Sequence, residues 1–216
     1  AAMDTQNRGM ELALLLTLPA SVALIVCGQP IAAALFGYGK FDAGDVARTA
    51  EALAAFSLGL PSYILVKVLT PGFYARQDTR TPVRYAMISM AVNLAFNLAL
   101  IVPLQHMGPP LATAIASTVN VAMLYWTLVR RGHFQVDARL KRRAPRLALA
   151  AVAMGVVLWF GQDLLTPYLH GTWLVRGLAL AALVSAGGLV YALATLVTGA
   201  FTRADLALLR RRRTAS

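Results

Sequence analysis

Asparagine and threonine side chains occur inside apolar stretches of this chain, where their polar groups need partners. Asn93 and Asn97 are four residues apart, so they share one face of a helix. Thr113 and Asn120 belong to the next apolar stretch, which follows a short turn at residues 105–108. Because hydrocarbon cannot satisfy an amide or a hydroxyl, these side chains must face protein, water or an ion. Two interpretations remain open: hydrogen bonds between two helices, or a small oxygen-lined cation site.

Lys67 is the second residue that could meet a ligand. It lies about one turn inside the end of an apolar stretch, four residues before Pro71. Its stem can stay in the bilayer while the ammonium reaches the interface, or the ammonium can face a cavity and meet an anionic substrate. The sequence shows no metal-ligand spacing, nucleophile elbow, phosphate-binding loop or pair of carboxylates, so we do not expect an enzyme.

Six apolar stretches must position these residues. Each is close to or longer than the roughly 20 residues that cross a hydrocarbon core, and each is apolar on every side. Apolar residues make up 58% of the chain, charged residues only 13%, and the mean hydropathy is +0.64. We therefore predict an all-α, polytopic transmembrane helical bundle, one domain over residues 1–216. Its expected spans are 9–36, 43–70, 81–104, 109–129, 145–165 and 172–200, followed by a basic cytoplasmic tail at 201–216.

The positive charges alternate between the gaps that separate these stretches. Seventeen of the twenty Lys and Arg precede the first stretch, fill every second gap or follow the last stretch, and only Lys40, Arg48 and Arg176 fall on the other side. Cytoplasmic loops of membrane proteins carry the excess of Lys and Arg, so both ends of this chain are expected in the cytoplasm. The net charge of +11 is therefore interpreted as a determinant of topology that also touches anionic lipids, and no nucleic acid partner is expected.

The gap between the second and third stretches carries an unusual sequence, VKVLTPGFYARQDTRTP at residues 66–82. It combines a helix stop, a Gly-assisted turn, an aromatic pair, a cationic loop and a Thr-Pro helix start. It closely resembles the corresponding loop of the MurJ/MviN family, the lipid II flippases of bacterial peptidoglycan synthesis. The segment LFGYGKF at residues 35–41 is also similar to that family.

The resemblance implies a fold and a transport function. Members of the family have fourteen spans in two lobes, within a superfamily of multidrug, oligosaccharide and polysaccharide exporters. This chain would be spans nine to fourteen, a fragment of a longer protein, which agrees with an N-terminus that lacks a starting Met. The implied partners are lipid II, membrane lipids and the missing N-terminal lobe, all in a bacterial inner membrane. Lipid II would cross by alternating access, past Lys67, Arg76 and Arg80.

The resemblance also suggests ligands inside the membrane. The last two family spans line a hydrophobic groove proposed to hold the lipid tail, and the main cavity arginines lie in the first lobe. Some members bind sodium with an Asn and an acid on span eleven and with a Thr and a carbonyl on span twelve. Asn93, Asn97 and Thr113 match these positions, with Pro109 near the carbonyl. Here Asn97 replaces the acid, a loss of charge that should weaken a cation site. No cofactor other than Na⁺ is expected.

Two alternatives stand beside the flippase hypothesis. A related exporter of polysaccharide carrier lipids or drugs would share the fold, although the loop at residues 66–82 argues against it. A membrane scaffold that transports nothing would have no solvent-filled cavity next to these helices.

Overall fold

All regular structure that the computed structural model describes, in residues 2–37, 39–169 and 173–200, is helical. The elements in chain order are α1 (Ala2–Val26), α2 (Gly28–Phe36), α3 (Ala43–Ser57), α4 (Leu60–Leu69), α5 (Pro71–Tyr74), α6 (Arg80–Leu104), the 3₁₀-helix η1 (Gln105–Met107), α7 (Gly108–Arg130), α8 (Ala138–Leu169) and α9 (Trp173–Val197).

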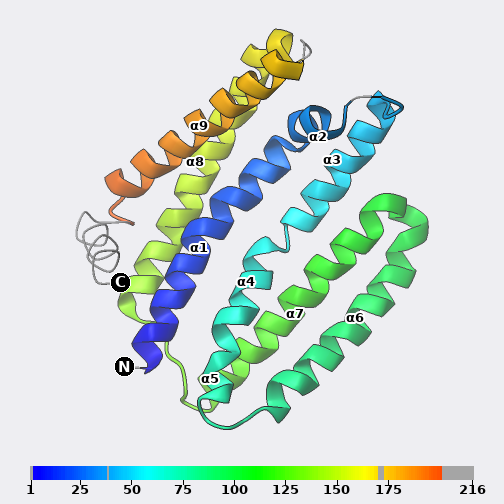
Figure 1. The fold of residues 1–216 in the computed structure, drawn as a ribbon. Helices are drawn as coiled ribbons and strands as arrows, with labels where there is room; N and C mark the ends of the chain where they lie inside the picture. The colour runs from blue at the N-terminus through cyan, green and yellow to red at the C-terminus, as the bar shows by residue number, and fades with distance from the viewer. Residues whose placement is uncertain (1, 38, 170–172, 201–216) are drawn as a thin grey trace, which may run out of the picture.

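The long helices lie side by side, with α1 between two groups (Figure 1). The α8–α9 hairpin lies on one side of α1, while α3, α4 and the α6–α7 hairpin lie on the other. One buried apolar cluster joins α1 to α8 and α9 around Leu147 and Leu158. A second joins α1 to α4, α5 and α7 around Leu69 and Phe73. The α1 helix is therefore the common wall of both halves of the core.

Five stretches are apolar and long enough to cross a membrane: Met3–Val26, Ala43–Tyr74, Arg80–Arg130, Ala138–Tyr168 and Leu174–Val197. The third contains two antiparallel helices, α6 and α7, so these stretches supply six crossings (Figure 1). Large apolar side chains face outward, with Leu164 80% and Val197 86% exposed. Such surfaces suit lipid rather than water. The prediction of an all-α, polytopic transmembrane bundle is confirmed.

Charge separates the two ends of the bundle. Ala2, the loops at 75–79 and 131–137, and the start of α8 lie at one end (Figure 1). We call it the basic end, because ten of the described Lys and Arg residues lie in or beside its loops between positions 76 and 146. The α2–α3 corner, η1 and the start of α9 lie at the opposite end, with Lys40, Arg48 and Arg176. Residues 201–216, the predicted tail, lie outside the described residues.

The helix bounds differ from the expected spans at three places. The first stretch begins at Ala2 instead of residue 9 and ends at Val26, where α2 takes a new direction. The second divides into α3 and α4, and α5 adds one helical turn where only a loop was expected. The α8 helix begins at Ala138, seven residues before the expected start at 145. That extension is rich in Lys and Arg, which are good helix formers, and its arginines pair with α1 as described below.

Prolines explain the first two breaks, because proline has no N–H for the carbonyl four residues earlier. Pro30 cannot bond to the carbonyl of Val26, and α1 ends there. Pro61 cannot bond to the carbonyl of Ser57, which instead accepts the hydroxyl of Ser21 at 2.5 Å.

Pro19 does not interrupt α1, which continues on both sides of it. Its missing N–H would have bonded to the carbonyl of Leu15. That carbonyl accepts a hydrogen bond from the hydroxyl of Tyr191 on α9, at 2.9 Å. At Pro19 and at Pro61, a carbonyl that lacks its usual partner within the helix therefore accepts a hydrogen bond from another helix.

Candidate functional site

Asp78 fastens the loop between α5 and α6 to the end of α7. Its carboxylate accepts hydrogen bonds from the backbone N–H of Thr81 at 3.0 Å and from the Thr81 hydroxyl at 2.7 Å. These bonds close the first turn of α6 in the manner of a helix cap. Arg131 donates from Nη1 to Asp78 Oδ2 at 2.6 Å. The Thr81 bonds, followed by the Arg131 guanidinium, lower the pKa of Asp78 to about 2, so the carboxylate is ionised at neutral pH.

Arg76 ties the same loop to the next one. Its Nη1 donates to the carbonyl of Gly72 at 2.6 Å, which satisfies the end of α5, and its Nη2 donates to the carbonyl of His133 at 3.3 Å. Arg76 was predicted to lie on the substrate path. The structure places Arg76 at the expected end of the bundle. Both terminal nitrogens of its guanidinium donate hydrogen bonds that hold two loops together.

Lys67 and Arg80 are the predicted substrate-path residues that remain accessible. Lys67 lies in the last turn of α4 and Arg80 begins α6, both toward the basic end. Both residues are exposed, and neither has an acidic partner among the described residues. Their charges are therefore available to an anion that approaches this end, although their role in transport stays a prediction.

A buried carboxylate joins α1 to α8 at the basic end. Glu11 is only 6% exposed, and Arg143 on α8 is 8% exposed. Arg143 donates from Nη1 to Glu11, Arg139 Nε lies 3.3 Å from Glu11 Oε2, and Arg8 donates to the same oxygen at 2.8 Å. One carboxylate thus meets three guanidinium groups from two helices. A buried charge needs such partners, because removing it from water is costly.

Two amide side chains near Glu11 on α1 add hydrogen bonds at the same end of the bundle. Asn7 donates to the carbonyl of Gln135 at 2.9 Å and accepts the backbone N–H of Asp137 at 3.2 Å, so it holds the loop that leads into α8. Gln6 donates to the carbonyl of Leu69 at the end of α4, at 3.4 Å. Gln6 also lies against Gly72, where an added Cβ would be 2.1 Å from Gln6 Nε2. A side chain at position 72 would therefore have to displace the Gln6 amide.

A polar groove runs between α4, α6 and α7 in the middle of the bundle. Its volume is about 400 Å³, and its lining includes, among apolar side chains, the polar residues Tyr63, Ser89, Asn93, Thr113, Ser117 and Asn120. The hydroxyl oxygen of Tyr63 and Oδ1 of Asn120 are buried without a hydrogen-bond partner in the described part of the chain.

The four residues predicted to bind a cation are joined by hydrogen bonds, and two of them, Asn93 and Thr113, line this groove. Asn93 donates from Nδ2 to the hydroxyl of Thr113 at 3.1 Å, and Thr113 donates to the carbonyl of Pro109 at 2.9 Å. Asn97 donates to Oδ1 of Asn93 at 3.4 Å. The hairpin thus brings Asn93, Asn97, Thr113 and Pro109 together, as the sequence predicted.

This arrangement is a neutral chain of hydrogen bonds in which Asn93 Oδ1, the Thr113 hydroxyl and the Pro109 carbonyl each accept one donor. No carboxylate belongs to the network. Hard cations prefer sites with several oxygens and negative charge. These residues offer a cation no negative charge, so sodium binding stays a prediction and we derive no step of transport through it. Among the described residues there is likewise no group of three His, Cys, Asp or Glu that could hold a metal.

The interactions of Glu11 were not anticipated from the sequence. Glu11 is the one acidic residue within the first apolar stretch at 9–36, and that isolation was an available signal. Its partners Arg139 and Arg143 are about 130 positions away, so local spacing could not identify them.

A family model places this fold and its loops among known proteins. The model described as lipid II flippase MurJ matches residues 1–179. That range contains the loops at 75–79 and 131–137 and the cluster around Glu11. The chain belongs to the MurJ family. Its relatives include two proteins named probable lipid II flippase MurJ. The first, from Rhizobium meliloti, is 41% identical over 88% of this chain and 36% of its own length. The second, from Rhizobium tropici, is 37% identical over 97% of this chain and 39% of its own length.

A solved structure of MurJ supports the fold. The lipid II flippase MurJ in an inward closed conformation aligns with a TM-score of 0.66 at 22% identity. The alignment covers 87% of this chain and 38% of the solved one. This chain therefore spans well under half the length of the MurJ proteins it matches. The relatives are named as flippases, which are transporters rather than enzymes.

Proposed function

We propose that this chain forms part of a transporter that moves lipid II from the cytoplasmic to the periplasmic face of a bacterial inner membrane by alternating access. Membership of the MurJ family over residues 1–179 carries the proposal. The relatives are named for lipid II, and a polar anionic head on a polyprenyl tail cannot cross hydrocarbon unaided. A protein route for the head alone removes that barrier, while the tail stays in lipid.

The charge of the basic end supports its assignment to the cytoplasm. Lys and Arg concentrate there, as the positive-inside rule requires of cytoplasmic loops, so α1 would begin in the cytoplasm and α9 would return to it. The exposed Lys67 and Arg80 would then meet the pyrophosphate of lipid II as it enters. Loops clasped through Asp78 and Arg76 would keep these two charges in place.

The exposed apolar faces of α8 and α9 offer a path for the tail. Phe160, Leu164, Leu178 and Leu189 are each at least 65% exposed on these helices. A polyprenyl chain can lie against such a surface without losing contact with lipid. This supports the groove expected for the last two spans, without assigning its position.

The experiment is transport of lipid II in vesicles that contain the full-length protein to which this chain belongs. We expect movement of lipid II across the bilayer, and slower movement for Lys67→Ala, by about two- to fivefold for the loss of one attractive charge. Lys40→Ala is the matched control, since Lys40 is an exposed lysine at the opposite end, and it should transport normally. Normal transport by Lys67→Ala would show that the ammonium only reaches the interface.

Two further outcomes separate the alternatives. A wild-type protein that moves another carrier lipid or a drug but not lipid II would be a related exporter. No movement of any such substrate, together with thiol reagents failing to reach cysteines placed along α4, would indicate a scaffold.

A further inference from the structure

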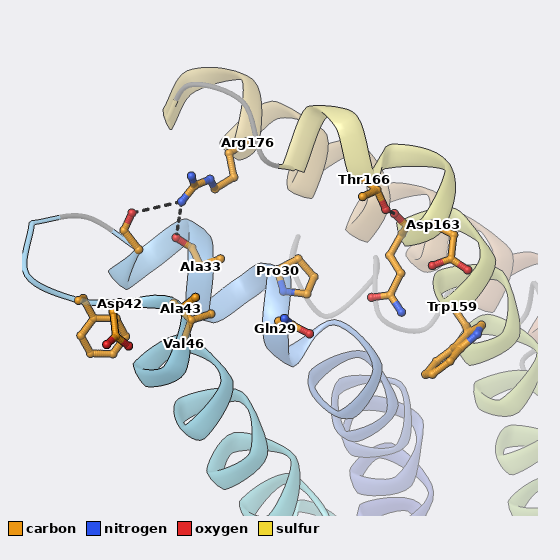
Figure 2. Close-up of a pocket in the computed structure, with 13 residues that line it drawn as sticks. Gln29, Pro30, Ala33, Asp42, Ala43, Val46, Trp159, Asp163, Thr166 and Arg176 are labelled. Atoms are coloured by element: carbon orange, nitrogen blue, oxygen red, sulfur yellow. Dashed lines mark hydrogen bonds between the residues drawn. The ribbon is translucent and has the colours of Figure 1, made fainter.

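A second pocket lies at the opposite end of the bundle, away from the groove and the basic loops. It is a space of about 490 Å³ between the α2–α3 corner and the α8–α9 hairpin (Figure 2). Small-molecule sites in proteins usually enclose about 300–1,000 Å³. Its lining contains two acidic residues, Asp42 and Asp163, and one basic residue, Arg176. The transport proposal uses none of these residues.

The α8 wall presents an aromatic ring and a carboxylate one helical turn apart. Trp159 and Asp163 are at positions i and i+4, and both line the pocket (Figure 2). Asp163 is exposed and has no hydrogen-bond or ion-pair partner within the described ranges. An indole face attracts cations, and a carboxylate accepts hydrogen bonds from an ammonium group. This wall therefore suits a primary amine.

The facing wall presents a guanidinium group in a fixed position. Arg176 Nη1 donates to the carbonyl of Ala33 at 2.8 Å and to that of Gly37 at 3.3 Å, both at the end of α2 (Figure 2). These bonds hold the start of α9 against α2. Nη2 has no hydrogen-bond partner in the described part of the chain. A positioned guanidinium is suited to a phosphate group.

The surroundings of the pocket favour a lipid over a soluble ligand. Leu35 and Phe36 on α2, and Phe160 and Leu164 on α8, are large, apolar and exposed next to the lining residues. A ligand with long apolar chains would cover these surfaces while its polar part entered the pocket. Aromatic residues such as Trp159 are also common where a membrane meets water.

We propose that this pocket binds the headgroup of a phospholipid that carries a phosphodiester and a primary amine, as phosphatidylethanolamine does. The phosphate lies against Arg176, and the ammonium lies against Trp159 and Asp163. Asp42 lies across the pocket from Trp159 and Asp163 and accepts a hydrogen bond from the backbone N–H of Asp45 (Figure 2). The lining of the pocket is separate from the residues assigned to lipid II transport, and only the neighbouring Phe160 and Leu164 also belong to the face offered to the lipid II tail.

The test is equilibrium binding to the purified full-length protein in detergent, with bound lipid counted by native mass spectrometry. Phosphatidylethanolamine should bind more tightly than phosphatidylglycerol, which lacks the amine. Asp163→Asn should weaken the binding of phosphatidylethanolamine about tenfold, the size of one charge-assisted hydrogen bond, and leave that of phosphatidylglycerol unchanged. Glu51→Gln is the matched control, because Glu51 is a carboxylate at the same end that does not line the pocket.

Three results would overturn the proposal. Equal binding of phosphatidylethanolamine by the wild type and by Asp163→Asn would remove the amine site. Equal binding of the two lipids by the wild type would remove the selectivity. Free phosphoethanolamine bound as tightly as the lipid would assign the pocket to a soluble ligand. Thermal unfolding of each variant, expected to match the wild type, separates lost binding from lost folding.

Discussion

The basic end and the opposite end of this bundle are held together in different ways. At the basic end, Glu11, Asn7 and Asp78 join α1, α8 and two loops through side chains that are buried or half-buried. At the opposite end, Arg176 joins α9 to α2 beside an open pocket, and an exposed pair, Glu51 and His106, joins α3 to η1. The comparison teaches that several of the charges at the basic end, which the sequence predicts to be topology determinants, also hold loops and helices together.

The largest effect is expected from breaking the Glu11 cluster. Glu11→Gln would leave the buried Arg143 and its neighbours without a counter-charge, at a cost of about 3–5 kcal/mol in the free energy of unfolding. The same change at the opposite end, Glu51→Gln, should cost less than about 1 kcal/mol, because that pair is exposed. Thermal unfolding of the two purified variants measures the difference. Equal losses of unfolding free energy would show that the two carboxylates stabilise the two ends equally.

A smaller effect is expected from filling the contact between Gly72 and Gln6. Gly72→Ala should destabilise the protein by about 1–3 kcal/mol, because the new methyl group overlaps the Gln6 amide and disturbs its bond to Leu69. Gly177→Ala on α9 is the control, since an added Cβ there meets nothing within 4 Å. Combining Gly72→Ala with Gln6→Ala should recover part of the loss in unfolding measurements. No recovery would place the cause elsewhere.

The Asp78 clasp should weaken only in strong acid. Its folded pKa of about 2 is below the ordinary value of 3.8, so the stabilisation is complete above about pH 4 and is lost as the pH falls through about 2. A spin label at Ala75 should gain mobility over that interval in the wild type. Asp78→Asn should show high mobility at every pH. A wild-type label whose mobility changes near neutral pH would contradict the assignment.

The smallest effect is expected in the polar groove, where neutral groups satisfy one another. Asn97→Ala combined with Thr113→Val should leave transport within about twofold of wild type, with no sodium dependence to lose, if the network only joins helices. Asn97→Asp adds the charge that a cation site needs, so it should create or strengthen sodium dependence. Sodium-dependent transport in the wild type that the double variant abolishes would instead establish the cation site.

The sequence was most informative where local patterns decide the structure. Hydropathy located the six crossings, and the short turn at 105–108 was enough to predict that Asn93 meets Thr113. It was least informative where distant helices meet. Three features depend on how the helices pack. They are the contact of α8 with Glu11, the hydrogen bond from Arg76 to the carbonyl of His133, and the pocket beside Arg176. No spacing of residues along the chain encodes those contacts directly.

The bond between Tyr191 and Leu15 has a consequence for how the protein is made. Synthesis proceeds from the N-terminus, so α1 enters the bilayer long before α9 exists, and Pro19 leaves the carbonyl of Leu15 without a donor. Hydrocarbon offers no substitute, so this early helix keeps an unsatisfied group until a hydroxyl 176 positions later arrives. A chain interrupted before α9 would retain that defect in α1. The α9 helix thus completes α1, which gives the cell a chemical difference between copies that have α9 and copies that lack it.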